Sequence, residues 1–123
     1  MRITEALLEK GEWLLDALKR IGHSMIPSNC ILNKKLTGLG ATHSEIHSKR
    51  SSIIIEPNVP VILGKLDNND NLEAVYAKCS LYNLKRYLQM DIEYKKIITT
   101  PESFYKIRKA AVELNIDIFK TFF

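Results

Sequence analysis

The sequence predicts an α/β protein in which a mostly parallel sheet lies between two layers of helices, as a three-layer sandwich. Segments with helix and strand patterns alternate along the chain, which is the order that βαβ units require. Residues 52–56 are apolar and β-branched on both faces, which is typical of an interior parallel strand covered from both sides. A glycine turn at residues 37–40 leads from a strand directly into a helix.

The composition indicates one ordinary folded domain. The chain has 123 residues, of which 46% are hydrophobic and 26% charged, and this excludes wholesale disorder, a collagen-like repeat and a disulfide scaffold. The net charge of +4 arises downstream of Asn29, because four basic residues balance four acidic ones before it. Such an excess is compatible with contact to a polyanion and equally with a solvated surface.

The cysteines and the apolar runs indicate a cytoplasmic protein without a membrane partner. Cys30 and Cys79 lie far apart in apolar settings, so we expect buried free thiols of a reducing compartment. The start of the chain lacks the pattern of a signal peptide. The longest apolar runs are far shorter than the ~20 residues that a membrane-spanning helix needs.

The first third of the chain predicts a helix, a strand and a second helix. Thr4 is the expected N-cap of an amphipathic helix that Gly22 ends. A strand at residues 30–36 then runs through the glycine turn into a helix at residues 41–49.

The middle of the chain predicts two strands around a short helix. Residues 52–56 form the first strand, which Pro57 and Pro60 end. A helix is expected at residues 61–66, and a weaker strand at residues 72–77.

The last third predicts a helix capped by Ser80, a strand at residues 96–99 and a final helix. Thr100 is the expected N-cap of that final helix, with Pro101 in its first position. Its buried stripe consists of Phe104, Ile107, Ala111 and Leu114. A strongly apolar run, residues 116–123, follows.

The glycine turn is the first candidate for chemistry. Backbone N–H groups at the start of a helix bind phosphate, and the helix dipole favours an anion there. Gly38 and Gly40 permit the special backbone angles of such a loop, and Thr42 stands where a magnesium-binding hydroxyl belongs. The usual pattern is G-x-x-x-x-G-K-[ST], whereas Lys35 and Ala41 replace its first glycine and its lysine. A plain strand–helix turn explains the same residues.

Three segments, read in order, resemble the first motor domain of superfamily-two helicases. Residues 37–42, Thr-Gly-Leu-Gly-Ala-Thr, look like their phosphate-binding motif, usually Thr-Gly-x-Gly-Lys-Thr. Residues 53–58 look like the strand-then-Pro-Thr segment that follows, and residues 97–103 are similar to the strand-then-Thr-Pro-Glu motif. The resemblance implies a partial RecA-like nucleotide-binding domain at residues 30–123, after an N-terminal helix and loop at residues 1–29.

The resemblance also implies ATP and Mg²⁺ as cofactors and nucleic acid, DNA or RNA, as a partner. Carried over residue by residue, the nucleotide would be held by Thr37, Gly38, Leu39, Gly40, Ala41, Thr42 and His43, with Thr42 as the metal ligand. The nucleic-acid backbone would be contacted by Pro57, Asn58, Thr100, Pro101 and Glu102. Contacts of this kind are independent of base sequence and suit the modest positive charge.

Departures from the family leave enzymatic activity open. Ala41 removes the ammonium group that bridges the outer phosphates of ATP, although Lys34, Lys35 or Lys49 could substitute for it. No Asp-Glu pair is present, and residues 118–123 look like the strand that would have carried that motif. The resemblance therefore implies a truncated relative, of the kind expected on mobile elements, with weak or absent hydrolysis. The alternative is a non-catalytic interaction or regulatory protein that keeps the fold without nucleotide.

Three further features of the sequence have two interpretations each. His43 and His47 have a zinc-binding spacing but lack a third ligand, so two exposed helical histidines are expected. Tyrosines interleaved with cations indicate either a platform for single-stranded nucleic acid or an amphipathic border of the core. The tyrosines are Tyr82, Tyr87, Tyr94 and Tyr105, and the cations are Lys85, Arg86, Lys95, Lys96, Lys106 and Arg108. A sheet that stops at residue 123 predicts a homo-oligomer through the C-terminal segment, with Phe122 or Phe123 packed against a second copy or into its own core.

Overall fold

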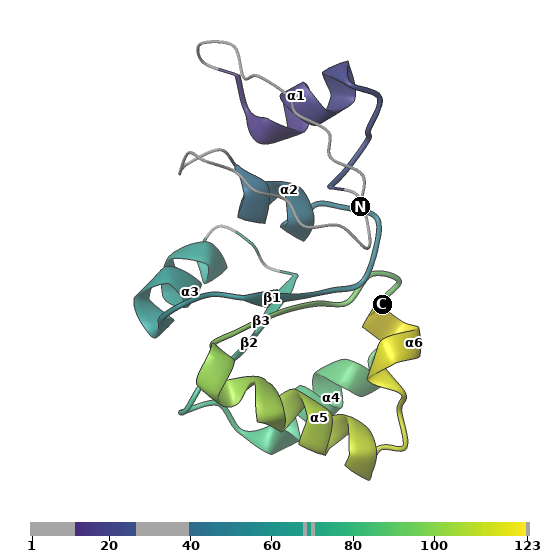
Figure 1. Cartoon of the computed structure of the whole chain (residues 1–123). Coiled ribbons are helices and arrows are strands. Elements are labelled where there is room, and N and C mark those ends of the chain that lie inside the picture. Colours follow the sequence, from purple (N-terminus) through teal and green to yellow (C-terminus); the bar gives the residue numbers. More distant parts are fainter. Residues whose placement is uncertain (1–11, 27–39, 68, 70, 123) are drawn as a thin grey trace. The chain divides into compact units, whose positions relative to one another are not determined.

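A computed structural model of the chain describes residues 12–26, 40–67, 69 and 71–122 (Figure 1). The chain divides into two compact units, Met1–Ser48 and Lys49–Phe123. The expected strand at residues 30–36, the expected cap Thr4 and the expected boundary after residue 29 lie outside the described residues. In its described part the protein is a mixed α/β protein with a small parallel sheet and several helices.

In the first unit, helix α1 (Leu14–Arg20) ends where the glycine pattern predicts. Gly22 has a φ of 97°, which side chains other than glycine rarely adopt. The N–H of Gly22 donates to the carbonyl of Lys19 (3.1 Å), and that of His23 donates to the carbonyl of Leu18 (2.8 Å). These two bonds are the Schellman pattern that satisfies the last carbonyls of a helix. Helix α2 (Ala41–Ile46) begins at the predicted residue and is shorter than expected.

In the second unit, three parallel strands form one sheet in the order β1-β3-β2. They are β1 (Ser52–Ile55), β2 (Leu72–Val75) and β3 (Lys96–Thr99), and all three were predicted. Each residue of β3 pairs in register on both sides, Lys96 with Ser52 and Leu72, and Thr99 with Ile55 and Val75. β3 is therefore the central strand, and all four of its residues are buried.

The prediction that residues 52–56 form an interior strand is wrong for the described part of the chain. There β1 pairs only with β3, and Ile55 is 53% exposed. Continuous apolar character fits an interior strand better than an edge strand, but it does not determine strand order, which depends on how the crossover helices connect the strands.

Helices α3 (Val59–Leu66), α4 (Leu81–Gln89) and α5 (Phe104–Glu113) follow the three strands in turn. α4 and α5 pack against each other beside the sheet, whereas α3 contacts β2 and lies apart from them (Figure 1). α3 begins before the predicted residue 61 because the Oδ1 of Asn58 accepts a hydrogen bond from the N–H of Val61 (3.1 Å). Ser80 caps α4 as predicted, since its Oγ accepts from the N–H of Asn83 (3.1 Å). Such caps are each worth about 1 kcal/mol.

A short 3₁₀ turn, Pro101–Ser103, connects β3 to α5. Thr100 precedes this turn as predicted, but its backbone supplies the bond: the carbonyl of Thr100 accepts from the N–H of Ser103 (3.1 Å). The predicted stripe of α5 is confirmed, because Ile107 and Ala111 are buried while Phe104 and Leu114 pack against the core.

The core of the second unit lies between β2, β3 and the α4–α5 pair. Ile97 and Ile107 have no exposed surface, and Val75, Leu84 and Leu88 surround them. Burying each such side chain contributes about 2 kcal/mol. Cys79 is a free thiol that is half-buried rather than buried.

The prediction that residues 118–123 form a strand is wrong. Residues Ile118–Phe122 form helix α6, which places Ile118 and Phe122 one turn apart and buries both in the core cluster. Asp117 starts the helix, because its carboxylate accepts from the N–H of Phe119 (3.0 Å) and its carbonyl accepts from the N–H of Thr121 (3.1 Å). Short apolar runs occur both in buried strands and in buried helical turns, so the composition of residues 118–123 does not distinguish a strand from a helix.

We expect Phe122→Ala to lower the free energy of unfolding by about 3 kcal/mol, because it leaves a cavity beneath α4 and α5. The matched control is Phe119→Ala in the same helix, since Phe119 is 70% exposed. That change should alter stability by less than about 0.5 kcal/mol. Urea denaturation of both variants measures the difference, and equal effects would contradict the packing of α6.

Candidate nucleotide and nucleic-acid sites

Only the last residue of the glycine turn, Gly40, is described; Thr37, Gly38 and Leu39 lie outside the described residues. Gly40 precedes α2 with a φ of 81°, in the left-handed region. Its carbonyl accepts the first helical hydrogen bond, from the N–H of Ser44 (2.9 Å). Ala41 and Thr42 follow in the first turn of α2, half-buried, and His43 is exposed.

The indole of Trp13 lies against Gly40. A Cβ built on Gly40 would come within 3.3 Å of the Cε3 atom of Trp13. The positive φ would strain any other residue at this position as well. Replacing Gly40 would therefore disturb the first unit whether or not a nucleotide binds, so binding is better tested at Ala41 and Thr42.

His43 in α2 and His47 at its C-cap are both exposed, as expected. Their rings lie 4.4 Å apart with an angle of 54° between them. In the part of the chain that the structure describes, no group of three or more histidine, cysteine, aspartate or glutamate residues could hold a metal ion.

The two segments predicted to contact nucleic acid leave neighbouring strands at the same edge of the sheet. Ile55 and Thr99 are register partners at the ends of β1 and β3. The pairing continues one residue further, because the N–H of Glu56 donates to the carbonyl of Thr99 (2.8 Å). Residues 57–58 and 100–102 therefore start side by side at the carboxyl edge, where ligands of parallel sheets bind.

The side chains of these two segments differ in how far they remain accessible. Pro57, Pro101 and Glu102 are exposed, whereas Thr100 is 4% exposed and Asn58 uses its Oδ1 to cap α3. Proline has no N–H to offer a phosphate. Glu56 and Glu102 add negative charge to this edge, so cations elsewhere must compensate if a phosphate backbone lies here.

The end of β2 is tied to the start of α5 by Lys106. Its Nζ donates to the carbonyls of Tyr76 (3.0 Å), Ala77 (3.0 Å) and Cys79 (3.1 Å). An ammonium group has three protons, so its donors are all used. In the sequence, Lys106 is one of the cations that could belong to a binding platform. Its three carbonyl acceptors lie 27 to 30 residues earlier in the chain, so no pattern in the neighbouring residues predicts these hydrogen bonds.

The tyrosine and cation set divides into core residues and surface residues. Tyr87 is buried, and its hydroxyl accepts from the N–H of Lys96 (2.7 Å) and donates to the carbonyl of Lys96 (3.1 Å). Lys96 is 1% exposed, and its Nζ donates to the Oγ of Ser52 (3.0 Å). Of the two interpretations, the border of the core therefore applies to Tyr87 and Lys96, because both close the start of the central strand.

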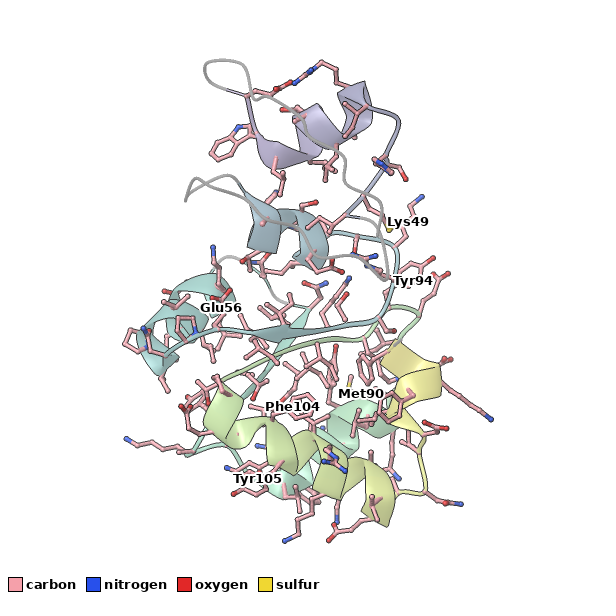
Figure 2. All side chains as sticks on the ribbon, viewed as in Figure 1. Lys49, Glu56, Met90, Tyr94, Phe104 and Tyr105 are labelled. Carbon is pink, nitrogen blue, oxygen red and sulfur yellow. The ribbon has the colours of Figure 1, made fainter. Side chains whose placement is uncertain are left out.

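Tyr82 and Tyr105 do lie on the surface, 69% and 60% exposed. Figure 2 shows Phe104 on the side of α5 that faces the sheet and Tyr105 on the opposite side. An open depression beside Tyr105 is lined by Arg108, Lys109, Val112 and Glu113.

A second depression lies between β2 and α4, lined by Glu73, Asn83, Arg86, Tyr87 and Met90. Burial raises the pKa of the Glu73 carboxyl above its ordinary value of 4.5. Burial also raises the pKa of the Tyr87 hydroxyl, and the nearby charge of Glu73 adds to this. On the outer surface, the hydrogen bond from Lys85 lowers the pKa of Glu113.

Comparison with protein families, with curated proteins and with solved structures finds no match for this chain. Among the described residues, no helix has both the length and the apolar character needed to cross a membrane.

Glu73→Gln is expected to stabilise the protein at pH 7. Because burial raises the folded-state pKa of Glu73, the charged form costs stability above that pKa, and the cost vanishes below the unfolded-state value. The gain in thermal midpoint should therefore shrink as the pH falls from 7 to about 4.

Glu113→Gln provides the opposite control. The pKa of Glu113 is lowered by Lys85, so its charge stabilises the fold at pH 7 and that contribution fades in acid. A gain from Glu73→Gln that grows toward low pH would contradict the described burial.

Proposed function

We propose that this protein is a helicase-like module that binds ATP with Mg²⁺ and acts with nucleic acid in the cytoplasm, and that its fold is an incomplete RecA-like, three-layer P-loop domain. Hydrolysis by this chain alone is weak or absent, because the loop lysine is replaced by Ala41 and no Asp-Glu pair is present. We include DNA as a substrate and an origin on a mobile element in this proposal.

The observation that carries the proposal is that β1 and β3 are neighbouring parallel strands whose ends pair in register. The resemblance pairs the end of each strand with a nucleic-acid motif, and the two motifs are more than 40 residues apart in the chain. The parallel pairing of Ile55 with Thr99 brings both motifs to one edge. A fortuitous similarity would not require these two strand ends to be neighbours.

The start of α2 supports the nucleotide part of the proposal. Gly40 has the left-handed conformation of a glycine turn, and Thr42 lies in the following turn of helix. Ala41 and Thr42 are the first two residues of α2, so their backbone lies at the N-terminal, positive end of the helix dipole. In this proposal Thr42 holds Mg²⁺, and the cation replaces part of the charge that the missing lysine would have supplied.

The contact between Trp13 and Gly40 favours a second candidate, a non-catalytic interaction protein that keeps the fold without nucleotide. The indole covers the glycine from one side. In that case the main function is self-association through the C-terminal segment. The exposed ring of Phe119 on α6 would make the contact, because Phe122 packs into the core of its own chain.

We expect Ala41→Lys to tighten the binding of a fluorescent ATP analogue, because the added ammonium group reaches the outer phosphates. Thr42→Ala should weaken only the Mg²⁺-dependent part of the binding. Lys120→Ala, which removes an exposed cation on α6, is the charge control and should change neither. Titration with and without Mg²⁺ measures all three.

Absence of binding by the wild type and by Ala41→Lys would overturn the nucleotide part and leave the interaction protein. ATP turnover at the rate of an ordinary motor would contradict the claim of weak hydrolysis, since one lost electrostatic donor costs about 3 kcal/mol in the transition state.

A further inference from the structure

Helices α4 and α5 carry the same surface pattern. In each helix the second residue is an exposed tyrosine, Tyr82 or Tyr105. In each helix the fifth and sixth residues are cationic: Lys85 and Arg86 in α4, Arg108 and Lys109 in α5. The ring and the sixth residue are four positions apart, so they are neighbours along one face of the helix.

The two helices present this pattern side by side. α4 follows β2 and α5 follows β3, so both begin at the carboxyl edge of one parallel sheet. They pack against each other, and Leu84 and Leu88 of α4 and Ile107 and Ala111 of α5 form their inward faces. Packed helices lie about 10 Å apart, so the outer surfaces of α4 and α5 are adjacent, and we call them together the double ridge. Tyr82 and Tyr105 are each the second residue of their helix, so both lie at the end of the double ridge nearest the carboxyl edge of the sheet.

The double ridge is strongly cationic. The two helices contain five cationic side chains and one carboxylate, Glu113, and this excess equals the net charge of +4 of the whole chain. Lys85 pairs with Glu113, and Lys106 uses its donors on backbone carbonyls. Arg86, Arg108 and Lys109 remain directed to the exposed side.

The surface beside Tyr105 can accept a flat apolar group. Val112 is 78% exposed and lines the same open depression as Tyr105, Arg108 and Lys109. An exposed ring, an apolar floor and two cations along one helix face match the chemistry of a nucleotide, which has an aromatic base and a phosphate.

We propose that the outer surface of α4 and α5 binds single-stranded nucleic acid, with bases stacked on Tyr82 and Tyr105 and phosphates held by Arg86, Arg108 and Lys109. The inference shares its partner with the proposed function but needs neither ATP nor the glycine turn. It also supplies the cations that the carboxyl edge, with Glu56 and Glu102, lacks. An acidic protein would use the cations but not the stacking faces of the rings, so the tyrosines separate the two partners.

The test measures binding of labelled oligothymidine and oligouridine to the full chain by fluorescence anisotropy. Tyr82→Ala and Tyr105→Ala should each weaken binding about tenfold, because each removes one stacking ring. Tyr82→Phe and Tyr105→Phe keep the ring and should bind like the wild type. The DNA and RNA arms show which backbone is preferred.

A second arm replaces the charges. Arg86→Gln and Arg108→Gln should each weaken binding and reduce the slope of log affinity against log salt by about 0.7. Lys120→Gln, an exposed cation on α6, is the control and should leave that slope unchanged.

Two outcomes would overturn the inference. Alanine variants of both tyrosines that bind as tightly as the wild type would exclude stacking. Polyglutamate that competes as well as the oligonucleotide would indicate an acidic protein partner. Because neither arm contains ATP, a failure of ATP binding would leave this result intact, and a failure here would leave the ATP-binding proposal intact.

Discussion

The pairing of β3 with strands on both sides is the constraint on which the second unit depends. Two hydroxyl groups secure the ends of this strand: Tyr87 bonds the N–H and the carbonyl of Lys96, and the Oγ1 of Thr99 donates to the carbonyl of Val75 (2.7 Å). All four residues of β3 are buried, and unpaired backbone groups there would each cost about 1–3 kcal/mol. The side chain of Tyr87 thereby couples α4 to the strand that follows it.

The position of β3 also determines where binding groups can gather. Because both neighbours are parallel to it, the segments after β1 and β3 and the starts of α4 and α5 all lie toward one edge of the sheet. That edge carries Glu56 and Glu102, while the adjoining helices α4 and α5 carry five cationic side chains and one carboxylate. A polyanion would therefore be attracted to the helices, and the strand ends would contact it only near their junction with α5.

Local features of the fold could be predicted from the sequence, and non-local ones could not. The β-branched run at Lys96–Thr99, the capping serine of α4 and the glycine after α1 depend on neighbouring residues. The strand order, the helical state of Ile118–Phe122 and the three carbonyl acceptors of Lys106 depend on residues far away in the chain. For the same reason, the sequence left open whether Tyr87 belongs to a surface platform or to the border of the core, because only tertiary contacts decide which ring is buried. Gly40 was predicted correctly as part of a turn, but the covering indole of Trp13 was not.

Photo-cross-linking tests the central claim most directly, which is that this sheet and its two adjoining helices form a nucleic-acid-binding surface at one edge. A single-stranded oligonucleotide that contains 5-bromodeoxyuridine would be irradiated with the full chain, and the attached residues mapped by mass spectrometry. The account predicts cross-links at Tyr82 and Tyr105, with weaker ones in residues 100–102. Cross-links confined to α1, α3 or α6, or none at a concentration where binding is saturated, would contradict it.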